Sequence, residues 1–266
     1  MIKLVASDMD GTLLDSKKRL PADIVSVVRQ MKEKGATFIA ASGRQYDALR
    51  RDLAPMADDI IFIAENGALV VENDQQLFLD ALDPREIRGI LQAAKGLEGV
   101  YACVCCAHCA ICEDTASREF IDMMQMFYPS TKVVSDLIGY CSEMTDVCKV
   151  AFYDEGDAAS HELPVLRDRL PDHLAVILSG EQWVDVMKPG VNKGRAMQMI
   201  MQLKGVRPEE CMAFGDYLND LEMLMCVGES YAMENGLEQV KAAAKYIAPG
   251  NDENGVVRVI KERFSL

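Results

Sequence analysis

Small polar and acidic residues stand at three separate points of the sequence, each at the end of a short apolar run. Residues 8–12 read DMDGT, residues 42–44 read SGR, and residues 215–220 read GDYLND. If the apolar runs are strands of an open α/β sheet, their carboxyl ends form the edge at which ligands bind. We therefore expect these three clusters to meet at one edge of the sheet.

Four aspartates are expected at that edge, namely Asp8, Asp10, Asp216 and Asp220. Neighbouring carboxylates repel each other unless a cation or a shared proton relieves the repulsion. Carboxylates are also the ligands that a hard divalent cation such as Mg²⁺ prefers. A single aspartate after a strand is most simply a turn former or a helix N-cap, so it is the set of four that predicts a Mg²⁺ site.

The apolar pattern around these clusters alternates between strand and helix. Strands are predicted at 3–7, 36–42, 60–64 and 211–215, and helices at 20–35, 45–53, 193–203 and 255–264. The strand segments are apolar at successive positions, which is typical of parallel strands that are covered by helices on both faces. The sequence therefore predicts an α/β fold with a Rossmann-like, parallel-sheet core domain.

The middle of the sequence departs from this rhythm between residues 82 and 188. Helices are predicted at 84–94, 118–127 and 158–170, and strands at 101–106, 109–114, 147–154, 174–180 and 182–188. Strands in pairs with separate helices are typical of an α+β arrangement. We expect residues 82–188 to form an inserted domain and residues 1–81 and 189–266 to form the core domain.

Four sequence motifs resemble those of the haloacid-dehalogenase-type phosphohydrolases. DMDGTLL resembles the DxDGT signature of that family, ASGR its second motif, GVNKG its lysine motif and GDYLND its acidic motif. The segments ENGA at 65–68 and AMENG at 232–236, together with the insert, resemble the Cof-type subfamily. The resemblance covers nearly the whole chain and implies that residues 82–188 form a large α/β cap domain.

The resemblance implies a role for each of the four aspartates. Asp8 would attack the phosphoryl group and form an aspartyl-phosphate, while Asp10 would protonate the leaving alkoxide and then activate water. The first step needs an ionised Asp8 and a protonated Asp10, so their surroundings must separate their pKa values. Mg²⁺ would be held by the carboxylates of Asp8 and Asp216 and by the backbone carbonyl of Asp10. Asp220 would act through hydrogen bonds or a metal-bound water.

The other motif residues would bind the phosphoryl group. The resemblance implies that Ser42, the Gly43 amide and Asn219 bind phosphoryl oxygens, and that Lys193 neutralises charge in the transition state. Its spacing alone favours a solvated lysine at the end of a helix. For Arg44 two interpretations stay open, which are contact with substrate and pairing with a surface carboxylate.

A second group of reactive side chains lies in YACVCCAHCAIC, residues 101–112. We expect a hairpin that turns at 107–108, with Cys106 and Cys109 on one face of the sheet and Cys103, Cys105 and Cys112 on the other. A tetrahedral metal site needs four ligands that converge on one point, so this arrangement favours packing in a core. The alternative is that one or two thiols line the pocket for the leaving group.

The composition limits the classes of partner. The net charge of −14 argues against nucleic acid and anionic membranes, because both need a basic surface. No apolar run approaches the length of a membrane span, and MIKLVASD reaches an aspartate before a signal-like apolar region. Nine cysteines without an export signal predict reduced thiols and a cytoplasmic location.

The sequence thus predicts a Mg²⁺-dependent phosphatase that hydrolyses a small phosphorylated metabolite, with a sugar phosphate favoured. The enzymatic alternative is a phosphomutase, which would return the phosphoryl group to the substrate. Alternatives from other classes are a phospho-acceptor module resembling a response regulator and a thiol-based metal or redox sensor. In a response regulator the acceptor aspartate follows the third strand, whereas here the aspartate pair follows the first. The sequence leaves the oligomeric state open.

Overall fold

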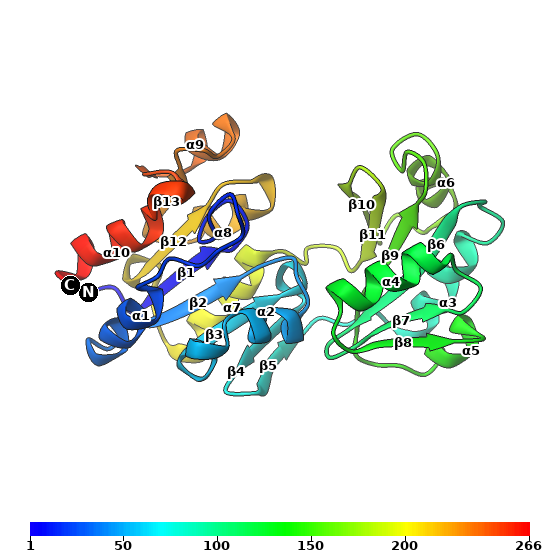
Figure 1. Cartoon of the computed structure of the whole chain (residues 1–266), viewed down its shortest axis with the longest axis horizontal. Helices are drawn as coiled ribbons and strands as arrows, with labels where there is room; N and C mark the ends of the chain where they lie inside the picture. The colour runs from blue at the N-terminus through cyan, green and yellow to red at the C-terminus, as the bar shows by residue number, and fades with distance from the viewer. The chain divides into compact units, whose positions relative to one another are not determined.

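The computed structural model describes residues 1–266, except for the side chain of Phe127, and divides into two compact units. The first unit comprises Met1–Phe78 and Asn192–Leu266, and the second comprises Leu79–Val191. The chain therefore passes from one unit to the other within a few residues of the two boundaries expected from the sequence. The two units are described separately (Figure 1).

The first unit contains an eight-stranded sheet with the strand order β14-β13-β12-β1-β2-β3-β4-β5. From β14 to β3 every neighbouring pair is parallel, which confirms the predicted α/β class with a parallel core sheet. The strands are β1 (Leu4–Asp8), β2 (Thr37–Ala41), β3 (Ile60–Ala64), β4 (Leu69–Glu72), β5 (Gln75–Leu79), β12 (Cys211–Gly215), β13 (Glu229–Met233) and β14 (Tyr246–Ala248).

One edge of this sheet differs from the purely parallel sheet that the sequence predicted. Strand β4 runs antiparallel to β3, and a two-residue turn at Asn73 and Asp74 leads from β4 to β5. Both turn residues have positive φ, 50° and 59°, as the favoured two-residue hairpin turns require. The Asn-Asp pair between two apolar segments is the sequence signal that would have predicted this hairpin.

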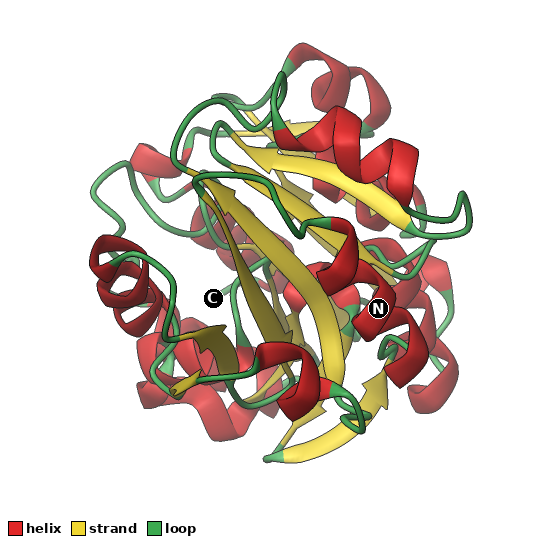
Figure 2. Ribbon diagram, turned by 90° about the vertical axis from the view of Figure 1, so that its right-hand side faces the viewer, coloured by secondary structure: helices red, strands yellow, loops and turns green.

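Helices cover both faces of the first sheet. The helices α7 (Lys193–Lys204), α8 (Leu221–Met225) and α9 (Glu238–Ala243) pack on one face, where their apolar residues share a core with alternate residues of the central strands. The helices α1 (Ile24–Glu33), α2 (Tyr46–Asp52) and α10 (Gly255–Phe264) contact the strands or each other outside that core. Figure 2 shows the helices around the twisted strands.

The second unit contains a six-stranded, mostly antiparallel sheet with the order β10-β11-β9-β6-β7-β8. Its strands are β6 (Val100–Cys106), β7 (Ala110–Glu113), β8 (Thr131–Val134), β9 (Val147–Asp154), β10 (Ala175–Gly180) and β11 (Trp183–Met187). Its helices are α3 (Pro84–Ala93), α4 (Arg118–Phe127), α5 (Leu137–Cys141) and α6 (Glu162–Arg169). The sequence prediction omitted β8 and α5, both of which are short.

The two faces of this second sheet have separate cores. Residues of α3, α5 and α6 share one core with Cys106, and Cys109 packs at its border. Residues of α4 share the other core with Cys103, Cys105 and Cys112. Cys103 is paired with Cys112 across the hairpin, and the Cys106 N–H donates to the Cys109 carbonyl over 2.8 Å. The predicted hairpin and the predicted division of its thiols between two faces are confirmed.

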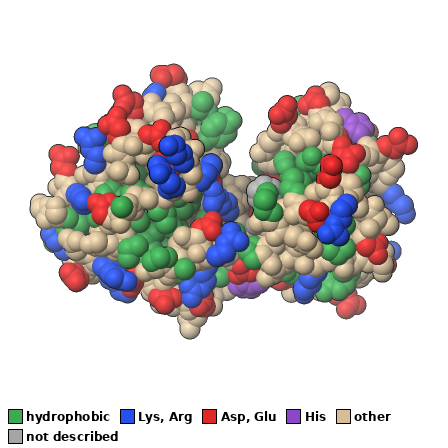
Figure 3. Space-filling model, in the orientation of Figure 1, with side chains coloured by type: hydrophobic (Ala, Val, Ile, Leu, Met, Phe, Trp, Pro, Cys, Tyr) green, Lys and Arg blue, Asp and Glu red, His purple; other side chains and the backbone are tan. Residues whose placement is uncertain are grey.

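The surface carries both signs of charge. On the face drawn in Figure 3, basic side chains are interspersed with acidic ones in both units. Within the described residues, helices long and apolar enough to cross a membrane are absent.

Candidate active site

Three neighbouring parallel strands of the first unit end at the same edge of the sheet, in the order β12-β1-β2. Asp8 is the last residue of β1, Ser42 follows β2, and Asp216 follows β12. The chain turns sharply at Gly11, where φ is 83° and a Cβ atom would lie 2.4 Å from Oδ2 of Asp216. Only glycine therefore fits between Asp10 and Thr12, and this close approach brings the DMDGT segment against the GDYLND segment.

Lys193 is the first residue of α7 and is fully buried. Its Nζ donates to Oδ1 of Asp8 over 2.5 Å and to Oδ1 of Asp220 over 2.7 Å. Burial favours the neutral amine, but the charges of Asp8 and Asp220 outweigh it and raise the pKa of Lys193. The interpretation of Lys193 as a solvated helix-end lysine is therefore wrong.

Three carboxylates converge beside this lysine. Asp8, Asp216 and Asp220 each offer one oxygen, and these oxygens lie within 4.8 Å of one another. Oδ1 of Asp216 accepts a hydrogen bond from the Thr12 hydroxyl over 2.7 Å. Oδ2 of Asp220 accepts from the backbone N–H groups of Asp216, over 3.0 Å, and Tyr217, over 3.1 Å.

The electrostatics of these carboxylates suit a divalent cation. Burial, opposed by Lys193, raises the pKa of Asp8 to about 7, and burial also raises the pKa of Asp216. A buried carboxylate that is costly to ionise is stabilised in its charged form by a nearby cation. Converging carboxylate oxygens are the donor set of Mg²⁺, so the residues present fit the predicted ion.

Asp10 does not join this cluster, in contrast to the expected convergence of four carboxylates. Its Oδ1 accepts from Nη2 of Arg44 and from Nζ of Lys18, each over 2.6 Å, and its Oδ2 accepts from Nε of Arg44 over 2.8 Å. Arg44 also donates to Asp52 over 3.1 Å. Two cations outside the carboxylate cluster thus hold the Asp10 side chain. Of the two interpretations of Arg44, the structure shows the pairing with carboxylates, namely those of Asp10 and Asp52.

The order of the two pKa values is the reverse of the one expected for the first step. Burial acts to raise the pKa of Asp10, but hydrogen bonds from Arg44 and Lys18 outweigh it and hold that pKa below its ordinary value. Burial dominates at Asp8 and raises its pKa. In this arrangement Asp10 is the more acidic of the two, because it has two cationic partners and is less deeply buried.

A further asparagine links the other motif residues. Gly43 lies so close to Asn66 that a Cβ atom would be 3.0 Å from the Asn66 amide. Nδ2 of Asn219 donates to Oδ1 of Asn66 over 3.1 Å, and Ser42 is buried beside them, with its Oγ accepting from the Arg44 N–H. Asn66 was missed as a site residue from the sequence. Its signal is an Asn-Gly pair directly after a strand, which is typical of the left-handed conformation (φ 54°) found here.

The AMENG segment supports the loop after β1. Nδ2 of Asn235 donates to the Gly11 carbonyl over 2.8 Å, and its Oδ1 accepts from the Asn251 N–H over 3.0 Å. A Cβ atom on Gly236 would lie 3.0 Å from the Asp216 backbone. This segment therefore positions the backbone around the carboxylates.

Residues 5–260 match the family described as haloacid dehalogenase-like hydrolase. This chain belongs to that family. It is 31% identical over 265 residues to the 5-amino-6-(5-phospho-D-ribitylamino)uracil phosphatase YbjI of Escherichia coli (97% of this chain, 95% of the relative). It is 28% identical over 284 residues to the phosphatase of the same name, YitU, of Bacillus subtilis (99% and 98%).

Solved structures of the family share the fold. SMU.1108c of Streptococcus mutans has a TM-score of 0.86 and 27% identity, with 100% of both chains covered. A haloacid dehalogenase-like hydrolase of Bacteroides thetaiotaomicron has a TM-score of 0.86 at 24% identity, with 99% of this chain and 100% of that chain covered. The predictions of the family, of the fold class and of a hydrolase are confirmed. Members of this family that resemble the chain over nearly its full length are named phosphatases.

Proposed function

We propose that this protein is a Mg²⁺-dependent phosphatase that hydrolyses a small phosphorylated metabolite through an aspartyl-phosphate. The observation that carries the proposal is the buried contact of Lys193 with Asp8 and Asp220 at the edge where Asp216 also lies. Relatives that match nearly the full length of the chain are named phosphatases. An all-carboxylate cluster with a buried lysine suits an anionic substrate and a cation better than any thiol chemistry.

In this proposal Asp8 is the nucleophile. Lys193 holds one of its oxygens over 2.5 Å, which fixes the carboxylate at the end of β1 and stabilises its ionised form. An ionised, immobilised carboxylate is oriented for in-line attack on phosphorus. The same ammonium group offsets the negative charge that develops on the transferring phosphoryl group.

Asp10 is the proton donor to the leaving alkoxide and then the base that activates water. Its ion pairs with Arg44 and Lys18 favour the ionised form, which is the form needed for the second step. For the first step these pairs must loosen. An arriving phosphate dianion competes with Asp10 for both cations, so substrate binding itself releases Asp10 to take up a proton.

The remaining motif residues bind and orient. Ser42, the Gly43 amide and Asn219 bind phosphoryl oxygens, with Asn66 holding Asn219 in place. The carboxylates of Asp8 and Asp216 and the backbone carbonyl of Asp10 would hold Mg²⁺. Asp220 is occupied by Lys193 and by two backbone amides, so it positions the loop that carries Asp216. When bound, the ion neutralises phosphoryl charge and the repulsion between the carboxylates.

The substrate is proposed at the level of its class, a phosphate monoester of a small metabolite. A sugar phosphate is the favoured substrate, and the names of two relatives add 5-amino-6-(5-phospho-D-ribitylamino)uracil as a specific candidate. We propose a cytoplasmic location because nine cysteines, an odd number, are typical of a protein that keeps its thiols reduced. A phosphomutase would show itself by transferring the phosphoryl group to substrate and not to water.

The test is a screen for phosphate release from a panel of phosphorylated metabolites with Mg²⁺, alongside a generic aryl phosphate. Asp8→Asn should lose turnover of the aryl phosphate by several orders of magnitude with an unchanged circular dichroism spectrum. Asp168→Asn, at an exposed aspartate of α6, is the matched control and should keep full activity. Appreciable turnover by the Asp8→Asn protein would contradict the assignment of the nucleophile.

A further inference from the structure

Three successive residues of the first unit, Glu65, Asn66 and Gly67, have left-handed backbone conformations. Their φ values are 48°, 54° and 105°. Residues other than glycine rarely adopt this region, and those that are held in it cluster at functional sites. The segment directly follows β3, at the edge of the sheet where Asp8 ends β1. Its strained backbone therefore calls for a functional reason.

This left-handed turn contacts three segments that carry motif residues. The Asn66 N–H donates to the Ser42 carbonyl over 3.0 Å. A Cβ atom on Gly67 would lie 2.3 Å from the carbonyl oxygen of Asn192, the N-cap of α7. Oδ1 of Asn66 accepts from Nδ2 of Asn219 over 3.1 Å. The Asn66 side chain therefore stands where these three segments of the site meet.

The Asn66 amide uses only one of its two polar atoms within the protein. Both atoms lie 3.0 Å from the position of a Cβ atom on Gly43, so the amide lies against the Gly43 backbone. Oδ1 has Asn219 as its partner, whereas Nδ2 has no hydrogen-bond acceptor among the residues that the structure describes. Asn66 is half-buried, and a half-buried donor without a protein acceptor is suited to an oxygen of a ligand.

The charged donor of the site is already largely engaged. Nζ of Lys193 donates to Asp8 and Asp220, so one of its three N–H groups remains. A phosphoryl group presents several oxygens, and neutral amides can bind them without forming ion pairs with the neighbouring carboxylates. The free Nδ2 of Asn66 is such a donor, and it lies beside the Gly43 backbone.

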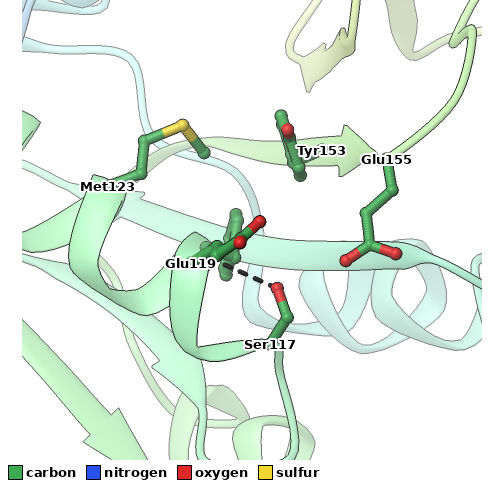
Figure 4. A pocket seen from close by; sticks show the side chains of 6 residues that line it. Ser117, Glu119, Met123, Tyr153 and Glu155 are labelled. Atoms are coloured by element: carbon green, nitrogen blue, oxygen red, sulfur yellow. Dashed lines mark hydrogen bonds between the residues drawn. The ribbon is translucent and has the colours of Figure 1, made fainter.

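The pocket of the second unit has the opposite character. Glu119 and Glu155 are among its lining residues and are exposed, and Figure 4 shows their carboxylates among the side chains that line it. Carboxylates repel a phosphate. Of these two places, the neutral donors around Asn66 are therefore the ones that suit an anion.

We propose that Asn66 binds the phosphoryl group of the substrate directly, with Nδ2 donating to the oxygen that the Gly43 N–H also binds. Four neutral donors then hold the phosphoryl group, namely the side chains of Ser42, Asn66 and Asn219 and the Gly43 amide. This inference rests on the proposed phosphatase function and adds a substrate contact to it. The contact is distinct from the support that Asn66 gives to Asn219, because it persists when Asn219 is removed.

The test is a calorimetric titration of the full-length protein with inorganic phosphate in the presence of Mg²⁺. Asn66→Gly removes the donor and leaves a residue that adopts the left-handed conformation without strain. It should raise the Kd for phosphate by about tenfold to hundredfold, the usual effect of losing a hydrogen bond to a charged group. Asn73→Gly is the matched control and should bind phosphate like the parent, because Asn73 is also left-handed (φ 50°) but is exposed in the turn between β4 and β5.

A double-variant cycle separates direct contact from support of Asn219. If Asn66 acts only through Asn219, adding Asn66→Gly to Asn219→Ala should change nothing. If Asn66 binds the phosphoryl group itself, the double variant should bind phosphate about tenfold more weakly than Asn219→Ala. Equal Kd values for these two proteins would overturn the proposal, and so would a parent that binds no phosphate at millimolar concentrations.

Two further measurements on the same samples exclude other causes. The Mg²⁺ concentration for half-maximal hydrolysis of an aryl phosphate should be the same in Asn66→Gly as in the parent, since loss of one donor leaves the carboxylates in place. A raised Mg²⁺ requirement would show that the site has loosened and would count against the proposal. A parent that binds phosphate but does not hydrolyse the aryl phosphate would contradict the proposed function and not the Asn66 contact.

Discussion

Each unit buries a lysine among acidic side chains, and the two arrangements differ in their geometry. In the first unit Lys193 contacts both Asp8 and Asp220, and three carboxylate oxygens converge within 4.8 Å. In the second unit Lys149 donates to Asp185 over 2.9 Å. Among the described residues, the group of converging carboxylates is Asp8, Asp216 and Asp220, which all belong to the first unit. Both units therefore bury charged groups, and the first differs in that several carboxylate oxygens converge on one point. This convergence is the feature that a metal-dependent active site requires.

The second unit also buries an acid whose charge is poorly compensated. Glu162 is fully buried, and burial, followed by the charges of Asp154 and Asp185, raises its pKa to about 8. Asp154 has its own partner, because Oδ2 lies 2.6 Å from Nδ1 of His161. Glu162 therefore lowers the stability of the fold at neutral and alkaline pH. Four sets of variants test this contrast between the two units.

The largest effect is expected for Lys193→Met. The change leaves Asp8 and Asp220 buried without their cation, so hydrolysis should be abolished and the free energy of unfolding should fall by about 3–5 kcal/mol. Activity with an aryl phosphate and urea unfolding measure the two effects. Lys149→Met is the counterpart in the second unit and should lose stability while keeping hydrolysis. An equal loss of activity in both variants would remove the distinction between the two lysines.

Gly11→Ala tests the close approach that forms the carboxylate cluster. Its Cβ atom would lie 2.4 Å from Oδ2 of Asp216, so Asp216 must move, and activity should fall with a higher Mg²⁺ concentration needed for half-maximal rate. Gly35→Ala is the matched control, since its φ is 80° and nothing lies within 4 Å of the added atom. It should cost only the backbone strain of about 1–2 kcal/mol. Unchanged Mg²⁺ dependence in Gly11→Ala would contradict the placement of Asp216.

Glu162→Gln should stabilise the protein in a pH-dependent way. The pKa of Glu162 is about 8 in the fold against an ordinary value of 4.5, so the folded protein binds more protons between these values and its stability falls as pH rises through this window. The neutral amide removes that fall. The gain in unfolding free energy should be small at pH 4 and grow with pH to at most about 5 kcal/mol above pH 8, because each pKa unit of the shift contributes about 1.4 kcal/mol. A gain that does not depend on pH would show that the charge of Glu162 is not its cause.

The smallest effect on activity is expected for the thiols. Because they lie in two separate cores, we expect them to take no part in hydrolysis. A variant with all five replaced by alanine should keep Mg²⁺-dependent hydrolysis of the aryl phosphate and lose only packing stability. Thermal unfolding and phosphate release measure the two properties. Loss of activity in a folded variant would contradict a purely structural role for Cys103, Cys105, Cys106, Cys109 and Cys112.

The sequence alone determined the elements and the place where they meet. Apolar runs followed by polar residues are local features, and the rule that parallel strands share an edge then brings Asp8, Ser42 and Asp216 together. The cysteine hairpin could also be predicted, because side chains alternate between the faces of a strand once its turn is known. The short β8 and α5 escaped prediction because few residues carry their periodic signal.

Only the tertiary structure decided the burial, the ionic partners and hence the pKa of the charged side chains at the site. The sequence placed Asp8 and Asp10 two residues apart, but the fold buries Asp8 against Lys193 and turns Asp10 toward Arg44 and Lys18. Burial and charge partners set a pKa, and here most of them come from residues distant in sequence, such as Lys193 and Arg44. The order of the two pKa values, the burial of Lys193 and the role of Asn66 therefore followed only from the packed structure.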